Sequence, residues 1–390
     1  MGYSLRKLGE IADITKLAGF EFTKYISYVD DGEIIALRAL NLRNGELDLT
    51  DIKRIKRDIS EQLTRSKLFV NDILLTYTGN GYGDCALITE NDKYHLAPNI
   101  CKISPKMDIV NPYYLYIYIR SKAFRAALTR YIGGSSQPTI PMKTLRIMDI
   151  PCFEINQQNK IVNIVKYLDE KIRVNNAINR NLEEQAQAIF KAWFINFEPF
   201  GGEMPDDWKI STLGNVSHMG AGGDKPVIVS ETQTYECPYP IYSNGLSDDG
   251  LYGYTNDYKI AEESITVSAR GTIGFVCLRH IPYTPIVRLV TLIPYANIMS
   301  AKFLYLWLKN IRIAGTGTTQ QQLTVPSFKK EEILVPTKDV LQSFTNKVNP
   351  LFEKLWETQS ENQTLSTLRD ALLPRLMSGE IDVSGIDIKP

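Results

Sequence analysis

A hydrophobic pattern that occurs twice constrains the fold of this chain more than any other feature of its sequence. Apolar residues recur in alternating steps of four and three from Ile161 to Trp193, with no proline or glycine between them. The same steps return 183 residues later, from Phe344 to Leu376. Such an a/d repeat predicts a long amphipathic helix in each copy. Both copies become polar at the same central layers, which hold Asn175 and Asn179 in the first copy and Thr358 and Asn362 in the second.

The two predicted helices are natural partners for each other. A helix of about 40 residues is ~60 Å long, and its apolar stripe must be covered by another element. An antiparallel pairing lets each helix carry the chain from one globular domain to the opposite end. The sequence therefore predicts a duplicated chain in which two long antiparallel helices form a coiled coil and separate two globular domains.

The globular part that precedes each helix also occurs twice. Leu5–Gly9 matches Trp208–Gly214, and residues 139–141 match residues 324–326. Short alternating apolar runs between Gly, Asn and Asp turns predict strands, and Asn111-Pro112 predicts a capped helix start, so the fold class is α+β. We expect a first globular domain over 1–150, a first long helix over 151–198, a second globular domain over 199–336, a second long helix over 337–379 and a tail over 380–390.

Composition excludes several classes of protein. The longest apolar run, around Tyr113–Ile119, is too short to span a membrane, and the N-terminus lacks the apolar stretch of a signal peptide. Five scattered cysteines without a CxxC pair indicate reduced thiols and a cytoplasmic protein, and three isolated histidines predict no metal site. Net charge is zero, although residues 1–150 carry 21 Lys and Arg against 17 Asp and Glu. A DNA-binding role would therefore need cations clustered on one face or a partner that adds attraction.

Three motifs that resemble enzyme signatures fail on inspection. Asn111-Pro112-Tyr113-Tyr114 lacks the second proline of the Asn-Pro-Pro-Tyr motif that holds the target amine in amino-methyltransferases. Gly79–Gly83 lacks the spacing and the following helix of a dinucleotide site, so it is either a tight turn or a place where backbone approaches phosphate. Gly315–Thr319 has no Gly-Lys-Thr and is not a phosphate-binding loop. We predict no catalytic residue and no cofactor on this chain.

Polar loops are the better functional candidates. One such loop precedes each Thr-(Ile/Val)-Pro segment, where glutamine suits adenine and Ser or Thr suits phosphate or base edges. An ordinary solvated loop remains the alternative for each. The candidate DNA-contacting residues are Asn80, Tyr82, Ser135, Ser136, Gln137, Lys225, Arg270, Thr272, Thr319, Gln320, Gln321 and Gln322.

The two predicted helices make the chain resemble the specificity (S) subunit of type I restriction–modification systems. The most typical parts are residues 182–194 of the first helix and the terminal Leu372–Ile381 of the second. The resemblance implies that each globular unit is a target-recognition domain reading half of a split double-stranded DNA site. It also implies that the helices dock two methyltransferase subunits, which bring S-adenosylmethionine, and that restriction subunits are further partners. Residues outside the a/d positions of the two helices are suited to such docking, namely Arg173, Glu183, Glu184, Glu357 and Glu361.

Two other functions remain open from the sequence. The first is the same kind of subunit in a methylation-only or another phage-defence assembly. The second is a scaffold whose globular domains bind proteins rather than DNA. Salt-dependent binding to duplex DNA in the presence of a methyltransferase separates the DNA readers from the scaffold.

Overall fold

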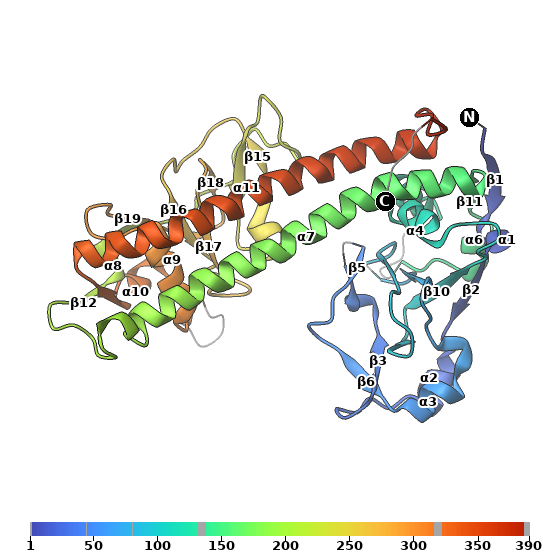
Figure 1. The fold of residues 1–390 in the computed structure, drawn as a ribbon, viewed down its shortest axis with the longest axis horizontal. Coiled ribbons are helices and arrows are strands. Elements are labelled where there is room, and N and C mark those ends of the chain that lie inside the picture. Colours follow the sequence, from blue (N-terminus) through green and yellow to red (C-terminus); the bar gives the residue numbers. More distant parts are fainter. Residues whose placement is uncertain (1, 44, 80, 132–137, 316–321, 386–390) are drawn as a thin grey trace. The chain divides into compact units, whose positions relative to one another are not determined.

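Two 40-residue helices, α7 (Ile155–Phe194) and α11 (Lys338–Met377), are the longest elements of the chain (Figure 1). Both lie inside the spans predicted from the heptads. This computed structural model describes residues 2–43, 45–79, 81–131, 138–315 and 322–385. The chain divides into unit 1 (Met1–Val174 with Asn362–Pro390) and unit 2 (Asn175–Glu361), so each unit contains half of each long helix.

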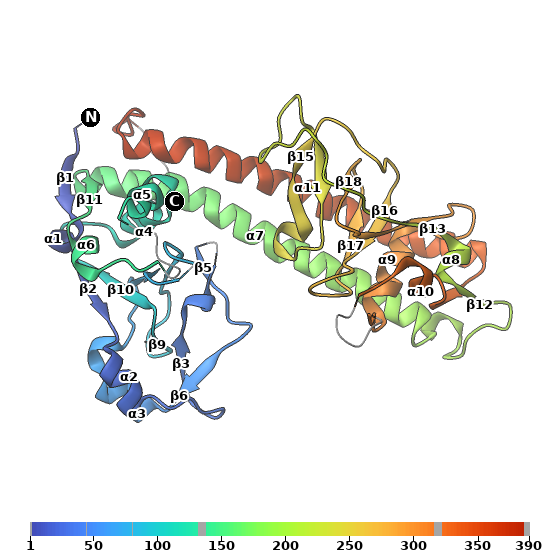
Figure 2. The same cartoon turned by 180° about the vertical axis from the view of Figure 1, so that it is seen from behind.

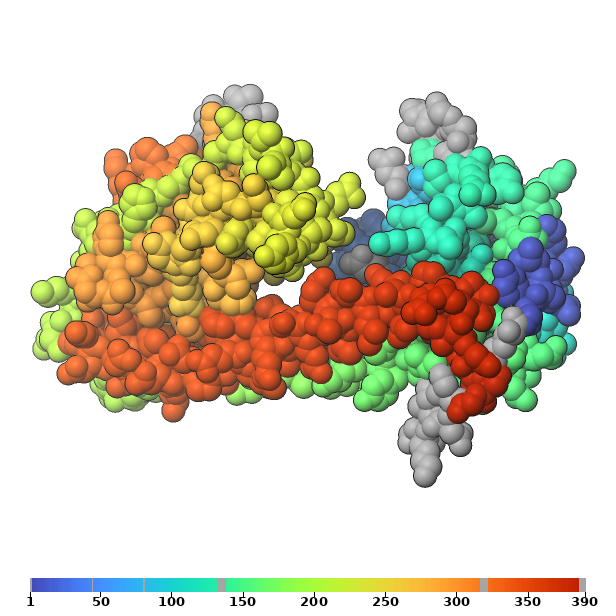
Figure 3. All heavy atoms as spheres, turned by 90° about the horizontal axis from the view of Figure 1, so that it is seen from above, coloured from blue at the N-terminus to red at the C-terminus, as the bar shows by residue number. Residues whose placement is uncertain are grey.

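Within each unit the two helices pair antiparallel, as predicted. In unit 2, Phe190 contacts Phe344 near one end of the pair, and Asn179 accepts a hydrogen bond from the Thr358 hydroxyl near the other. Residue numbers therefore fall along α11 as they rise along α7. In unit 1, Ile161 and Leu376 belong to one buried apolar cluster. Figure 3 shows the atoms of α11, orange to red, at the surface of each unit.

A four-stranded antiparallel sheet forms the centre of unit 1. Its order is β2 (Ala12–Lys16), β10 (Ile100–Pro105), β7 (Ile73–Thr76) and β8 (Cys85–Leu87). Ile73 and Leu75 of β7 pack in one apolar cluster and Leu74 packs in another, because successive side chains of a strand point to opposite faces. Both faces are covered, which explains the uninterrupted apolar run of this strand.

Helices α4 (Pro112–Arg120) and α5 (Lys122–Thr129) follow the sheet in the chain, and their buried residues share one apolar cluster with the sheet and the first half of α7. Figure 2 shows both helices beside the start of α7. Asn111 caps α4 by accepting hydrogen bonds from the backbone N–H groups of Tyr113 (2.9 Å) and Tyr114 (3.2 Å). The capped helix start predicted at this motif is thus confirmed. The remaining elements of unit 1 are β1 (Ser4–Lys7), α1 (Leu8–Ile11), α2 (Gly19–Tyr25), β3 (Ile34–Leu37), β4 (Leu42–Arg43), β5 (Glu46–Leu47), β6 (Lys53–Ile55), α3 (Arg57–Gln62), β9 (Tyr94–Leu96), α6 (Met142–Arg146) and β11 (Asp149–Cys152).

Unit 2 repeats this topology. Its central sheet runs β13 (Ser217–Ala221), β19 (Val290–Pro294), β16 (Ser264–Val267) and β17 (Val276–Arg279), and α9 (Ala301–Asn310) takes the place of α4. A smaller sheet in each unit contains one parallel pair, β3 with β9 and β14 with β18. The other elements are β12 (Lys209–Thr212), α8 (Leu213–Val216), β14 (Tyr239–Tyr242), β15 (Leu251–Thr255), β18 (Thr284–Pro285), α10 (Val325–Phe328) and β20 (Glu332–Val335).

The repeat extends to single glycines. A Cβ added to Gly9 would lie 3.2 Å from the Arg146 carbonyl oxygen, and a Cβ added to Gly214 would lie 3.2 Å from the Lys329 carbonyl oxygen. Both glycines let a short helix at the start of the unit contact the segment that follows the Thr-(Ile/Val)-Pro motif. This shared close contact explains why both opening segments carry glycine at this position.

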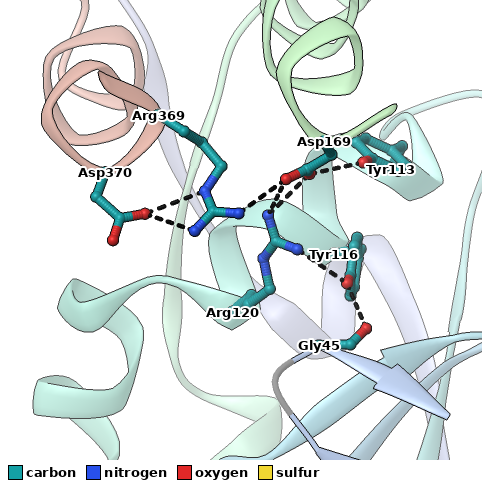
Figure 4. Close-up of polar contacts among 7 residues, drawn as sticks. All are labelled: Gly45, Tyr113, Tyr116, Arg120, Asp169, Arg369 and Asp370. Atoms are coloured by element: carbon teal, nitrogen blue, oxygen red, sulfur yellow. Dashed lines mark hydrogen bonds and ion pairs between the residues drawn. The ribbon is translucent and has the colours of Figure 1, made fainter. Parts of the chain in front are cut away.

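A polar cluster fixes α4 to the two long helices in unit 1 (Figure 4). Asp169 of α7 accepts hydrogen bonds from Arg120 (2.8 Å), Arg369 of α11 (3.0 Å) and the Tyr113 hydroxyl (2.9 Å). Burial and the charge of Asp169 raise the pKa of Tyr113, so this hydroxyl stays protonated and donates. Arg369, a charged residue at an a/d position of the repeat, is therefore paired with Asp169. The equivalent residue of the first copy, Ala186, is buried in an apolar cluster.

Candidate nucleic-acid interface

One end of the central sheet in each unit gathers those predicted DNA-contacting segments that the structure describes; we call it the loop end. In unit 2, strand pairing places Val290 beside Ala221 and Val267, and places Val267 beside Val276. The segments that leave these strands, residues 222–225, 268–275 and 286–289, therefore lie next to one another. In unit 1 the corresponding pairs are Lys16 with Cys101, Thr76 with Ile100, and Leu75 with Cys85.

The turn between β16 and β17 carries two of the predicted residues, Arg270 and Thr272, and both are exposed. Ser268 is buried beneath them, and its hydroxyl oxygen accepts a hydrogen bond from the Phe275 N–H (2.9 Å). The Arg270 guanidinium donates to Gln322 Oε1 at 3.3 Å. The tertiary structure thus joins two predicted loops that are 52 residues apart in sequence.

Lys225 stands at the same loop end on a separate segment. Its side chain is exposed, and its ammonium lies 5.0 Å from the centroid of the Tyr252 ring. The preceding Gly222 touches the β18–β19 connection so closely that an added Cβ would lie 2.7 Å from the Ile286 nitrogen. Glycine is required here for close backbone contact, and that contact brings Lys225 to the loop end.

In unit 1 the corresponding turn is also joined to the Thr-Ile-Pro segment. The Gly79 N–H donates to the Pro138 carbonyl (2.9 Å), and Thr78 pairs with Thr139. Tyr82 is half-buried, and its hydroxyl lies 3.3 Å from Thr129 Oγ1 of α5. The Tyr82 N–H donates to the Gly79 carbonyl (3.1 Å) and the Gly83 N–H to the Thr76 carbonyl (2.9 Å), so the chain turns tightly after β7. An approach of this backbone to phosphate stays a prediction. The other predicted residues of these loops lie outside the described part of the chain: Asn80, Ser135, Ser136, Gln137, Thr319, Gln320 and Gln321.

Sequence reasoning missed two side chains at the loop ends. Asn244 accepts a hydrogen bond from the Ala269 N–H (2.7 Å) and donates to the Val287 carbonyl (2.7 Å), so it joins two segments of unit 2. Arg125 of α5 is exposed and forms an ion pair with Asp84 beside the turn of unit 1. No motif surrounds either residue, and each gains its place only through a contact with a distant segment.

The predicted partner-docking residues occupy the long helices in different ways. Glu184 and Glu357 are exposed, and so is Arg173, which pairs with Glu170 one turn away. Glu183 accepts a hydrogen bond from the Tyr305 hydroxyl (2.6 Å), and Glu361 accepts one from Asn175 Nδ2 (2.7 Å). These two carboxylates thus already stabilise unit 2. All five positions stay predictions as docking residues.

The chemistry of the loop ends suits a nucleic acid. The exposed cations Lys225 and Arg270 stand beside hydroxyl and amide groups, which is the donor set that contacts phosphates and base edges. Among the described residues, no group of three or more His, Cys, Asp and Glu is arranged to hold a metal ion. In the same part of the chain, no helix is both long and apolar enough to cross a membrane.

Comparison with known proteins agrees with this description. The model of the type I restriction modification DNA specificity domain matches residues 2–184 and 205–348. The MjaIX specificity subunit of Methanocaldococcus jannaschii is 27% identical, over 96% of this chain and 93% of its own length. The HindI specificity subunit of Haemophilus influenzae is 24% identical, over 93% of this chain and 96% of its own length.

A solved structure shows the same fold. The crystal structure of the type I restriction–modification S subunit from M. genitalium superposes with a TM-score of 0.57, at 17% sequence identity and over 96% of both chains. The two family matches cover both globular domains and most of the first long helix. The chain therefore belongs to the type I restriction–modification DNA specificity family and is a non-catalytic, DNA-recognising specificity subunit.

Proposed function

We propose that the chain reads a split DNA site, with one half-site contacted by the loop end of each unit. The observation that carries the proposal is the repeated loop end with different side chains. Unit 1 presents Tyr82 and Arg125 there, whereas unit 2 presents Lys225, Arg270 and Gln322. The same arrangement of strands and loops in both units would place each loop end on DNA in a similar way. The different polar side chains would give each unit its own base preference.

The partners follow from the duplication of the helices. Each unit carries half of each helix, so any docking surface on the helical pair occurs twice, and we propose two methyltransferase subunits for each chain. The methyltransferase would supply S-adenosylmethionine and rotate the target base out of the duplex, as enzymes acting on bases do. Restriction subunits would join through that complex. The proposed place of action is the cytoplasm, where the DNA and these partners are found.

Co-expression of the chain with the methyltransferase subunit of its own operon tests the proposal. Sequencing of methylated bases should reveal one split motif with a fixed gap, absent when the chain is omitted. Binding of the purified complex to duplex DNA should weaken steeply with salt, because phosphate contacts release counterions. Methylation without a split motif, or no dependence on the chain, would contradict the proposal.

Stoichiometry needs a separate measurement. Native mass spectrometry of the complex under excess methyltransferase should give two partner subunits for each chain, and a one-to-one complex would contradict two docking surfaces. Addition of a restriction subunit and unmethylated DNA then distinguishes a restriction system from a methylation-only assembly.

A further inference from the structure

Each unit has a left-handed backbone corner at its loop end, in the connection that enters the central strand of the sheet. In unit 1 the corner residue is Asn99 (φ 72°), just before β10. In unit 2 the corner comprises Val287 (φ 53°) and Arg288 (φ 58°), just before β19. Positive φ is uncommon for a residue other than glycine, and for a β-branched residue such as Val287 it is a strained outlier. Strain of this kind gathers at functional sites.

Hydrogen bonds hold both corners in this conformation, and the two sets correspond. The Ala97 N–H donates to Leu37 O in unit 1, and the Ile286 N–H donates to Tyr242 O in unit 2, both at 2.9 Å. The Asn99 carbonyl then accepts from the Tyr77 N–H (3.0 Å), which ties the corner directly to the neighbouring turn.

In unit 2 the same junction is built from more contacts. The Val287 and Arg288 N–H groups donate to the carbonyls of Gly223 and Gly222, both at 2.8 Å. The Asn244 side chain bridges Val287 O to the Ala269 N–H. Backbone contacts thus fix the Arg288 corner between the segment of Lys225 and the turn of Arg270.

Neither polar side chain at these corners is buried in the fold. Arg288 and Asn99 are both exposed. Within the described residues, the Arg288 guanidinium makes no hydrogen bond or ion pair, and neither does the Asn99 amide. A well-anchored backbone corner with positive φ therefore presents an exposed polar side chain at the same place in both units.

We propose that Asn99 and Arg288 are equivalent base-reading residues, one for each half-site. Arginine matches the O6 and N7 acceptors of guanine, and asparagine matches the N6 and N7 groups of adenine in the major groove. Arg288 is thus assigned to a guanine in the half-site of unit 2, and Asn99 to an adenine in the half-site of unit 1. This inference rests on the proposed function, because it names the side chains that give each loop end its specificity.

Substitution at the corners tests the assignment in the complex with methyltransferase. Arg288→Gly removes the side chain and also relieves the strain, because glycine accepts positive φ. It should relax discrimination at one guanine position of one half-site by about 5- to 150-fold, with an unchanged or higher melting temperature. Asn99→Gly should act in the same way on an adenine of the other half-site only.

Two controls separate base reading from other effects. Lys209→Ala removes an exposed lysine of β12 in unit 2 and should change neither the motif nor the affinity. Lys225→Ala should weaken all sequences alike if that lysine contacts phosphate.

An unchanged motif with Arg288→Gly, or a uniform loss over all sequences, would overturn the assignment while the proposed function stands. A wild-type complex without any split motif would instead refute the proposed function itself. Loss of discrimination in both half-sites from a single corner substitution would also overturn the assignment.

Discussion

At the residue scale, Asp169 shows how one carboxylate can connect three elements. It is only 16% exposed and accepts hydrogen bonds from two arginines and a tyrosine. Arg120 and Arg369 are themselves about one-fifth exposed; the charge of Arg120 is balanced by Asp169, whereas Arg369 also pairs with Asp370. Removal of one member of a buried ion pair costs more than the pair contributes, because the remaining charge has no compensation.

We therefore expect Asp169→Asn to lower the free energy of unfolding of the full chain by about 2–4 kcal/mol, as measured by urea denaturation. Glu170→Gln, one residue further along α7, is the control because the Glu170–Arg173 pair is exposed and screened by water. That variant should leave the denaturation midpoint unchanged. Equal effects of the two substitutions would contradict a special role for Asp169.

His95 predicts a dependence of stability on pH. The ring is fully buried in unit 1, and burial lowers its pKa, although the Leu96 and Leu63 carbonyls near its two nitrogens oppose the shift. A lowered folded-state pKa means that the unfolded chain binds the proton first. The stabilisation is thus complete above the unfolded value of about 6.5 and is lost as pH falls below it.

The melting temperature of the wild-type chain should accordingly fall between pH 7.5 and pH 5.5. His95→Gln keeps a hydrogen-bonding side chain but cannot titrate, so its melting temperature should fall less over the same range. Identical pH profiles for the two proteins would show that other groups cause the dependence.

At the element scale, the two long helices alternate between apolar and polar layers. Phe190, Phe194 and Phe344 pack with Phe303 of α9 in unit 2, with ring centroids of Phe194 and Phe344 4.9 Å apart. Nearer the middle of the helices, Thr358 donates to Asn179 instead. Polar residues at a/d positions fix the register of a coiled coil at a cost in stability.

Replacement of this polar layer by Asn179→Leu with Thr358→Leu should therefore raise the melting temperature, because an apolar pair replaces a hydrogen bond with packing. The measurement is differential scanning calorimetry of the wild-type and double-variant chains. A lower melting temperature would mean that the polar pair stabilises the helices as well as setting their register. Phe344→Ala is the opposing control and should lower stability by about 3–5 kcal/mol through the cavity it leaves.

At the scale of the whole molecule, duplication gives two recognition frames within one chain. Each unit has its own sheet, its own loop end and its own half of each long helix. The segments that differ most, residues 20–70 and 224–262, belong to separate units. This arrangement favours independent reading of the two half-sites.

Replacement of residues 200–336 by the equivalent domain of a relative should consequently change one half of the methylated motif. The other half and the gap should persist, since residues 151–198 and 337–379 are unchanged. Methylome sequencing of cells with the chimera is the measurement. A simultaneous change in both halves would argue against independent reading.

The sequence by itself determined the frame of this protein. The heptad steps, the offset of 183 residues and the cap at Asn111 are local or periodic signals, and each produced the helix that it predicted. The pairing of the helices also followed, because two matched apolar stripes cover each other. The polar loops named from sequence included Arg270 and Gln322, which do lie together.

Only the tertiary structure decided which polar groups meet. Asn99, Arg288 and Asn244 carry no motif, and their positions depend on strand register between segments that are distant in sequence. Arg369 occupies an a/d position where the repeat predicts an apolar residue, because its partner, Asp169, comes from the other helix. Periodicity records which residues an element buries, whereas contacts between elements depend on how distant segments pack, and that packing leaves no regular trace in the sequence.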